Sequence, residues 1–160
     1  MILPMVEWYF PLKIVHVISA TVLFGTGLGT AFFKWIVDRS GNLAAIRVVS
    51  ERVVLADWLF TSPAVVVQAA TGVALAAIAG FPLTHGWVAY GIALYAIAGV
   101  CWIPVVVLQI RMRNLARRAE LTGTALGERY WRYARAWFWL GVPAFIAVVI
   151  AIGVMIIKPN

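Results

Sequence analysis

The sequence alternates between long apolar runs and short polar connections. Segments 14–33, 58–110 and 136–157 contain no Asp, Glu, Lys or Arg. A transmembrane helix needs about 20 consecutive apolar residues, so the first and last runs each fit one crossing. The middle run is long enough for two crossings, and the turn-forming residues 80–86 divide it. The pattern predicts an all-α polytopic membrane protein, an antiparallel bundle of four transmembrane helices with spans at about 11–37, 53–80, 87–110 and 136–157.

The residues beside the first two spans indicate further helical features. We expect the first helix to start near Pro11, since a proline in the first helical turn gives up no hydrogen bond. Between positions 43 and 56 the apolar residues recur at helical spacing, and the charged residues Arg47 and Glu51 lie off the apolar stripe. This segment is therefore expected to form an interfacial amphipathic helix before the second span.

The composition agrees with a membrane protein. Of the 160 residues, 64% are hydrophobic and 12% are charged, which is too few charges for a soluble domain of this length. We expect residues 1–160 to form a single integral membrane domain, because four crossings use nearly all of them. The N-terminal segment lacks a basic region and a small-residue cleavage site, so we expect the first span to be retained. Cys101 is the only cysteine, which excludes an internal disulfide and a thiolate metal cluster.

The basic residues are distributed unevenly between the two ends of the predicted bundle. Of the 13 Lys and Arg residues, all except Lys13 and Lys158 lie around the connection between the first and second spans or between the third and fourth. Because basic connections stay in the cytoplasm, both termini and the 81–86 turn are expected to face the periplasm or the cell exterior. The distribution predicts a multi-pass protein of the bacterial inner (plasma) membrane whose basic connections contact anionic lipid headgroups. We expect no nucleic-acid binding, because basic and aromatic residues do not interleave as they would on such a surface.

His16 is the residue that points most clearly to chemistry. It lies inside the first span, where an ionisable side chain is a functional candidate by default. Lys13 lies one turn earlier on the same face. The small residues Gly25, Gly27 and Gly29 would allow either close packing of another helix or the approach of a flat ligand. For His16 the alternatives are a structural hydrogen bond, proton chemistry, or axial ligation of haem, for which imidazole is the usual ligand.

A haem held by two axial ligands needs a second donor at the depth of His16. His85, in the outer turn, is the only other histidine, and Met155 lies near the outer end of the fourth span. Lys13 shares a helix with His16 and is poorly placed to bind opposite it, but it could neutralise a haem propionate. The candidate metal ligand is therefore His16, with His85 or Met155 opposite. For His85, simple exposure to solvent is the competing interpretation.

Three further polar side chains lie within the predicted spans. Asp57 is expected either to be a proton entry group or to pair with a nearby arginine: Arg52, Arg111 or Arg113. Gln68 and Gln109 each follow a proline by five residues, and they are expected to hydrogen-bond between helices or to face a substrate path. The sequence contains no nucleophilic serine motif, phosphate-binding loop or carboxylate cluster, so hydrolase and nucleotide-driven activities are not expected.

Three segments, 12–18, 54–60 and 104–113, resemble a bacterial family of four-span inner-membrane proteins of unknown function, and the resemblance covers nearly the whole chain. More distantly, the Lys13-x-x-His16 arrangement is similar to HemJ-type protoporphyrinogen oxidases, and the wider similarity includes CopD-like membrane domains. HemJ-type proteins are four-helix haem b proteins with a histidine in this place, so the resemblance implies haem binding by His16. They also have a functional lysine in a later helix. Segments 58–110 and 136–157 contain no lysine, which argues against the porphyrinogen-oxidising activity.

The sequence therefore predicts a haem b-binding redox or electron-transfer protein with His16 as an axial ligand. If the protein is an enzyme, a haem-dependent membrane oxidoreductase is expected. The alternative is a small transport or accessory membrane subunit without a redox cofactor, in which Asp57, Gln68 and Gln109 face a polar path. Besides the lipid bilayer, a second copy of the chain or a redox protein is the partner compatible with this pattern.

Overall fold

The computed structural model describes residues 3–159, with side chains from residue 7 onward, and this part of the chain is helical except for short connections. Four helical rods are long and apolar enough to cross a membrane: Glu7–Ser40, Leu43–Ile78, Gly86–Thr122 and Glu128–Ile157. The predicted all-α fold with four spans is thus confirmed. The elements are α1 (Leu3–Ser40), α2 (Leu43–Ala56), the π-helical turn η1 (Asp57–Thr61), α3 (Ser62–Ile78), α4 (Gly86–Thr122) and α5 (Glu128–Ile157).

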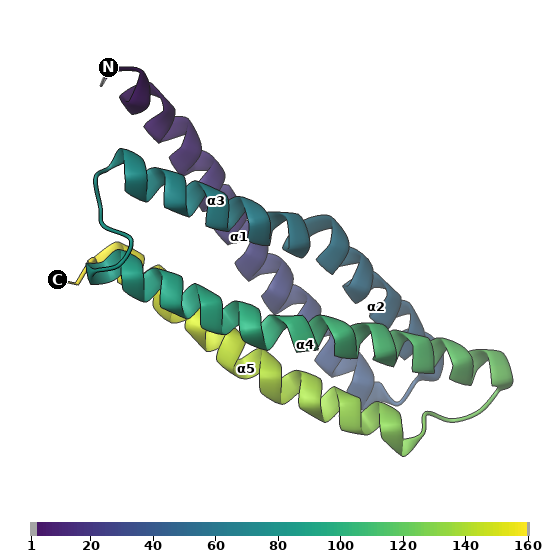
Figure 1. Ribbon diagram of the computed structural model, residues 1–160. Helices are drawn as coiled ribbons and strands as arrows, with labels where there is room; N and C mark the ends of the chain where they lie inside the picture. The colour runs from purple at the N-terminus through teal and green to yellow at the C-terminus, as the bar shows by residue number, and fades with distance from the viewer. Residues whose placement is uncertain (1–2, 160) are drawn as a thin grey trace.

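The four rods run in alternating directions, so every second connection lies at the same end of the bundle. The start of α1, the end of α5 and the turn between α3 and α4 lie at one end of the bundle, and the α1–α2 and α4–α5 connections lie at the other (Figure 1). Helix α4 packs along α5, α1 packs against both α2 and α3, and α2 packs against α4. The α1–α3 pair diverges from the α4–α5 pair toward the end where α1 starts and α5 ends. The two pairs are therefore held together mainly at the other end, which we call the basic end.

The best-packed part of the core lies toward this basic end. Its buried residues come from α2, α4 and α5: Ile46, Val105, Met112, Ala116, Tyr130 and Trp137. Many other large apolar side chains are exposed, among them Val66 at 68% and Val100 at 72%. Apolar exposure on this scale marks surfaces that another apolar phase covers, as lipid covers a membrane protein.

The helix boundaries differ from the predicted ones at two places. Helix α1 begins at Leu3 and Pro11 lies inside it, so the predicted start near Pro11 is wrong. Proline cannot donate to the carbonyl four residues earlier, but membrane helices tolerate this loss where the apolar pattern continues on both sides. Helix α4 continues through the basic segment to Thr122, so much of the predicted connection is helical. Gly123, with φ of 64°, ends α4 in the left-handed conformation that glycine adopts without strain.

The amphipathic segment 43–56 forms α2, as expected, and continues directly into the second span. Asn42 caps α2, and its side-chain oxygen accepts a hydrogen bond from the Ala45 amide at 3.1 Å. After α2 the helix widens into the π-helical turn η1, which ends two residues before Pro63. A π-helical turn accommodates the loss of the backbone hydrogen bond that the proline cannot donate, and such turns are frequent at functional sites.

Candidate functional site

His16 of α1 is linked to α3 by hydrogen bonds at both nitrogens of its ring. Nδ1 lies 2.8 Å from Thr71 Oγ1, and Nε2 lies 3.0 Å from the side-chain nitrogen of Gln68. Ser19, one turn further along α1, bonds to Gln68 Oε1. We call these four residues, His16, Ser19, Gln68 and Thr71, the histidine cluster.

The partners in the histidine cluster indicate how its protons are arranged. Thr71 donates its hydroxyl proton to the Val67 carbonyl at 2.6 Å, so it accepts a hydrogen bond from His16 Nδ1–H. Nε2 is then the unprotonated nitrogen and accepts a hydrogen bond from the Gln68 amide. The imidazole is neutral in this arrangement.

The same four residues also have an arrangement that suits a charged imidazole. If the Gln68 amide turns over, its oxygen accepts a hydrogen bond from a protonated Nε2, and its nitrogen donates to Ser19. The Ser19 hydroxyl can then donate to the His16 carbonyl, which lies 2.9 Å away. The cluster therefore has hydrogen-bond partners for both protonation states of His16, and one side-chain rotation separates the two.

Helix α3 approaches the His16 ring closely at Gly72. A Cβ atom at this position would lie only 3.2 Å from Cε1 of the ring. By contrast, Gly25, Gly27 and Gly29, the glycines expected to contact a helix or a ligand, have no such neighbour within 4 Å of their Cβ positions. The close approach thus involves a glycine that the sequence pattern did not single out, because it depends on the register of α1 against α3.

Polar side chains continue along the inner face of the α2–η1–α3 rod. They follow one another at spacings of about one or two helical turns, so they share one face. Four of these side chains are buried, and that of Gln68 is half-buried. We call the set the inner polar stripe; it consists of Ser50, Asp57, Thr61, Gln68 and Thr71. Tyr95 of α4 adds a polar group beside the stripe, because its hydroxyl donates a hydrogen bond to the Val65 carbonyl at 2.6 Å.

Asp57 lies in the middle of the inner polar stripe. Its Oδ1 accepts a hydrogen bond from the Thr61 hydroxyl at 2.9 Å, and the Gln109 side chain of α4 lies beside the carboxyl group. Asp57 Oδ2 and Gln109 Oε1 are buried and have no hydrogen-bond partner. Among the side chains of residues 7–159, no arginine forms an ion pair with Asp57, so the predicted arginine pair is wrong. The reason is geometric, because Asp57 is on the buried face of the rod while Arg52 and Arg111 are exposed.

A second buried cluster ties α1 to α5 at the basic end. Lys34 is only 1% exposed, pairs with Asp38 one turn along α1, and donates to the Tyr130 hydroxyl at 2.6 Å. Tyr130 donates in turn to Asp38 at 2.6 Å. We call these three residues the lysine cluster. Lys34 therefore carries a paired charge inside the bundle, although its place in the sequence groups it with the exposed basic residues.

The other residues predicted for a haem site have different neighbours from those of His16. Lys13 is exposed. His85 is exposed in the α3–α4 turn, where its Nδ1 lies 2.8 Å from the Thr84 hydroxyl. The methyl group of Met155 packs against α4, 3.5 Å from the Cβ position of Gly91. Among the described residues, none of these three side chains is hydrogen-bonded to the histidine cluster.

The histidine cluster meets one of two requirements for a metal ligand. In a metal-binding histidine, one ring nitrogen donates to a protein acceptor while the other binds the metal. The bond from His16 Nδ1 to Thr71 meets the first requirement. Nε2 faces Gln68, so binding of a metal would require Gln68 to move away. Across the described residues, no group of three or more His, Cys, Asp or Glu side chains is placed to hold a metal ion.

Comparison with known proteins gives one match. The family model described as "Predicted integral membrane protein (DUF2269)" matches residues 10–159. No curated protein and no solved structure matches the chain. The matched range includes both buried clusters and extends into all four membrane-spanning rods. The chain therefore belongs to the DUF2269 family of predicted integral membrane proteins.

Proposed function

We propose that this protein is a small transport or accessory protein of the membrane in which His16 takes up and releases protons. The observation that carries the proposal is the histidine cluster, which has partners for both the neutral and the charged imidazole. A purely structural histidine needs partners for one state only. Imidazole is also the side chain that changes its charge between about pH 5 and 8 without a strong perturbation.

The inner polar stripe supplies a path from this site toward the basic end. Gln68 and Asp57 are separated by about 16 Å along the rod, at about 1.5 Å per residue. Thr61 and the Tyr95 hydroxyl lie within that interval, and Ser50 follows next to Tyr130 of the lysine cluster. Gaps of this size require water molecules to bridge the polar groups. The path would therefore join the histidine cluster to the lysine cluster through intermittent hydration.

Labelling of the imidazole nitrogens with 15N tests the protonation of His16. The chain has two histidines, so NMR spectra of the labelled protein contain two sets of ring signals, and His85→Gln assigns them. We expect His16 to give the neutral Nδ1–H form at high pH and to titrate reversibly. Gln68→Leu should shift the titration of His16, because it removes the hydrogen-bond partner of Nε2. A His16 signal that stays constant from about pH 5 to 8 would contradict the proposal.

Proton movement itself can be measured in vesicles that contain the purified protein and a pH-sensitive dye. An imposed membrane potential should drive proton entry faster than in empty vesicles, and His16→Gln should reduce the rate to that of empty vesicles. His85→Gln is the matched control, because it removes the other histidine from an exposed turn. Equal rates for the wild type and His16→Gln would rule out proton transfer through the histidine cluster.

Binding of haem b is a second candidate function, and the bond from His16 Nδ1 to Thr71 favours it. The distant resemblance of Lys13-x-x-His16 to HemJ-type proteins supports the same function. Haem would supply one-electron redox chemistry when bound. A Soret band that His16→Ala abolishes and His85→Ala preserves would support a redox or electron-transfer role. A colourless protein that cannot take up added hemin would exclude it.

We also propose a location in the bacterial inner membrane with both termini outside the cytoplasm. The support is the concentration of basic residues in the α1–α2 and α4–α5 connections and the adjoining helix ends. Both connections lie at the same end of the bundle (Figure 1). A single orientation therefore satisfies the charge rule for both of them.

A further inference from the structure

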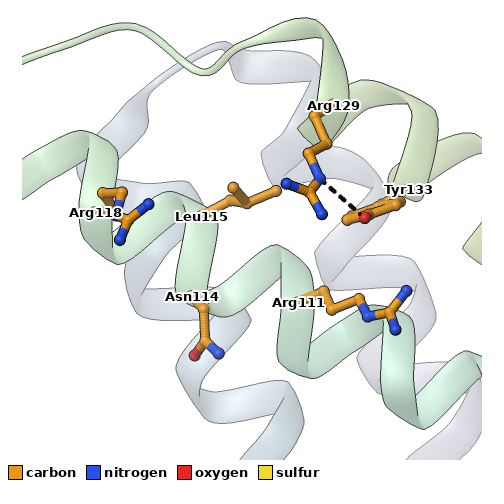
Figure 2. A pocket seen from close by; sticks show the side chains of 6 residues that line it. All are labelled: Arg111, Asn114, Leu115, Arg118, Arg129 and Tyr133. Carbon is orange, nitrogen blue, oxygen red and sulfur yellow. Dashed lines mark hydrogen bonds between the residues drawn. The ribbon is translucent and has the colours of Figure 1, made fainter.

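An open pocket of about 450 Å³ lies between the basic ends of α4 and α5. Figure 2 shows its lining, with Leu115 pointing from α4 toward Arg129 and with Tyr133 beside Arg129 on α5. Four of the lining residues come from α4 and two from α5. They are Arg111, Asn114, Leu115, Arg118, Arg129 and Tyr133.

The charge in this pocket is of one sign. Three of the six lining residues are arginines and none is acidic. Among the side chains of residues 7–159, none of the three arginines forms an ion pair. Arg129 donates to the Tyr133 hydroxyl at 3.0 Å, and the Arg111 guanidinium lies 5.8 Å from the centre of the same ring. Tyr133 thus holds two guanidinium groups near each other without neutralising either.

A second groove, between the α2–η1 rod and α4, provides the contrast. It is lined by Glu51, Val54, Leu55, Trp58, Arg113 and Arg117, and it includes a carboxylate. Arg117 lies 3.8 Å from Glu51, which also pairs with Arg47 at 3.1 Å. Two arginines of the basic end, Arg47 and Arg117, therefore have acidic partners from the protein itself. The α4–α5 pocket differs from this groove because it gathers three arginines without a carboxylate, so its positive charge is available to another molecule.

The pocket also lies at the boundary of the apolar spans. Arg111 directly follows the segment 58–110, and Tyr133 precedes the segment 136–157, both without charged residues. The phosphate groups of phospholipids occupy this level of a bilayer, next to the ends of the apolar spans. Leu115 adds an apolar wall to the pocket beside the arginines.

We propose that this pocket binds the phosphate of an anionic phospholipid headgroup. Guanidinium groups donate parallel hydrogen bonds to phosphate oxygens, and three of them compensate the charge better than a lone lysine would. A soluble phosphate ester offers the same oxygens, but only a lipid places its phosphate at this level and its acyl chains along the apolar spans. The proposal therefore assigns a discrete lipid site, which goes beyond general attraction between a basic surface and the membrane.

Native mass spectrometry of the full-length protein in a neutral detergent tests the site. The probes are phosphatidylglycerol, phosphatidylcholine and glycerol 3-phosphate. The pocket variant combines Arg111→Gln, Arg118→Gln and Arg129→Gln. The matched control removes the same charge from α4 and α5 outside the pocket, by combining Arg117→Gln, Arg132→Gln and Arg135→Gln.

We expect the wild type to prefer phosphatidylglycerol over phosphatidylcholine. The pocket variant should lose affinity for phosphatidylglycerol by about tenfold or more, and the control by about twofold or less. Equal losses in both variants would overturn the proposal in favour of general attraction. Equal binding of both lipids would also overturn it. Retention of glycerol 3-phosphate without a preference for phosphatidylglycerol would assign the pocket to a soluble phosphate ester and overturn the lipid assignment.

Thermal unfolding without added lipid shows whether the pocket variant folds like the wild type. If it does not, the single substitution Arg118→Gln replaces it, since Arg118 has neither of the tyrosine contacts of Arg111 and Arg129. Its expected loss of affinity for phosphatidylglycerol is about fivefold. An unchanged affinity in Arg118→Gln would then count against the site.

Discussion

At the scale of single residues, the sequence singles out His16 as a functional candidate, but it does not predict the neighbours of this side chain. An ionisable residue in an apolar run stands out by its type alone. Its partners Gln68 and Thr71 lie more than 50 positions away, and their pairing with His16 depends on how α3 packs against α1. Gly72 was missed for the same reason, since the sequence holds many other glycines of equal appearance.

The contact at Gly72 predicts opposite effects for two glycine substitutions. Gly72→Ala places a methyl group 3.2 Å from the His16 ring, so the ring must move and stability should fall by about 1–2 kcal/mol. Gly99→Ala is the control, since no other atom lies within 4 Å of its Cβ position in α4. It should leave stability unchanged or raise it by up to about 1 kcal/mol through helix propensity. Unfolding of both variants in detergent measures the difference in stability. A loss of stability in Gly99→Ala but not in Gly72→Ala would show that Gly72 does not pack closely against the His16 ring.

Asp57, which is buried, and Asp38, which is half-buried, should respond differently to replacement by asparagine. Asp57→Asn keeps an acceptor for Thr61 and gives the unpaired Gln109 Oε1 a possible donor, so stability should stay the same or rise. Asp38→Asn leaves the buried Lys34 without its counter-charge and should lower stability by about 3–5 kcal/mol. Urea or thermal unfolding in detergent would show this order. A larger loss for Asp57→Asn than for Asp38→Asn would mean that Asp57 has a charged partner.

At the scale of elements, the sequence predicted the number and approximate positions of the spans because long apolar runs report membrane crossings directly. It placed the start of α1 wrongly, since Pro11 suits a first turn but is also tolerated inside a membrane helix. The π-helical turn η1 was not predicted. Pro63 signals a disturbed helix, but whether the rod kinks or widens depends on its packing against α1 and α2, which the local sequence does not contain.

The lysine cluster predicts which tyrosine holds α5 to the rest of the bundle. Tyr130→Phe removes the hydroxyl that bonds to both Lys34 and Asp38 of α1, and should lower stability by about 1–3 kcal/mol. Tyr133→Phe on the same helix removes only a surface bond to Arg129 and should change stability by about 0.5 kcal/mol or less. Thermal unfolding in detergent provides the measurement. Equal losses in the two variants would show that the lysine cluster does not join the helices.

At the scale of the whole molecule, the polar clusters lie between the helices and the apolar side chains cover the outer surface. The outer faces carry exposed apolar side chains, while the inner polar stripe and the two clusters lie between helices. The two clusters contain α1, α3 and α5 residues that are distant in sequence, so which polar side chains meet depends on the packing and could not be predicted from residue types. The basic residues used by the charge rule are, by contrast, close together in the sequence, around the α1–α2 and α4–α5 connections. These two connections lie at one end of the bundle (Figure 1).

This grouping makes the orientation of the whole bundle testable with single labels. Ser40 and Thr122 are exposed beside the two basic connections, and Thr84 is exposed in the turn at the opposite end. We expect a membrane-impermeant thiol reagent to label Thr84→Cys in intact cells and to label Ser40→Cys and Thr122→Cys only after the membrane is opened, because basic connections remain in the cytoplasm. Each variant is made with Cys101→Ala, which removes the native thiol. Labelling of Ser40→Cys and Thr122→Cys in intact cells, with Thr84→Cys protected, would invert the bundle and place the arginine pocket and the lysine cluster on the outer side.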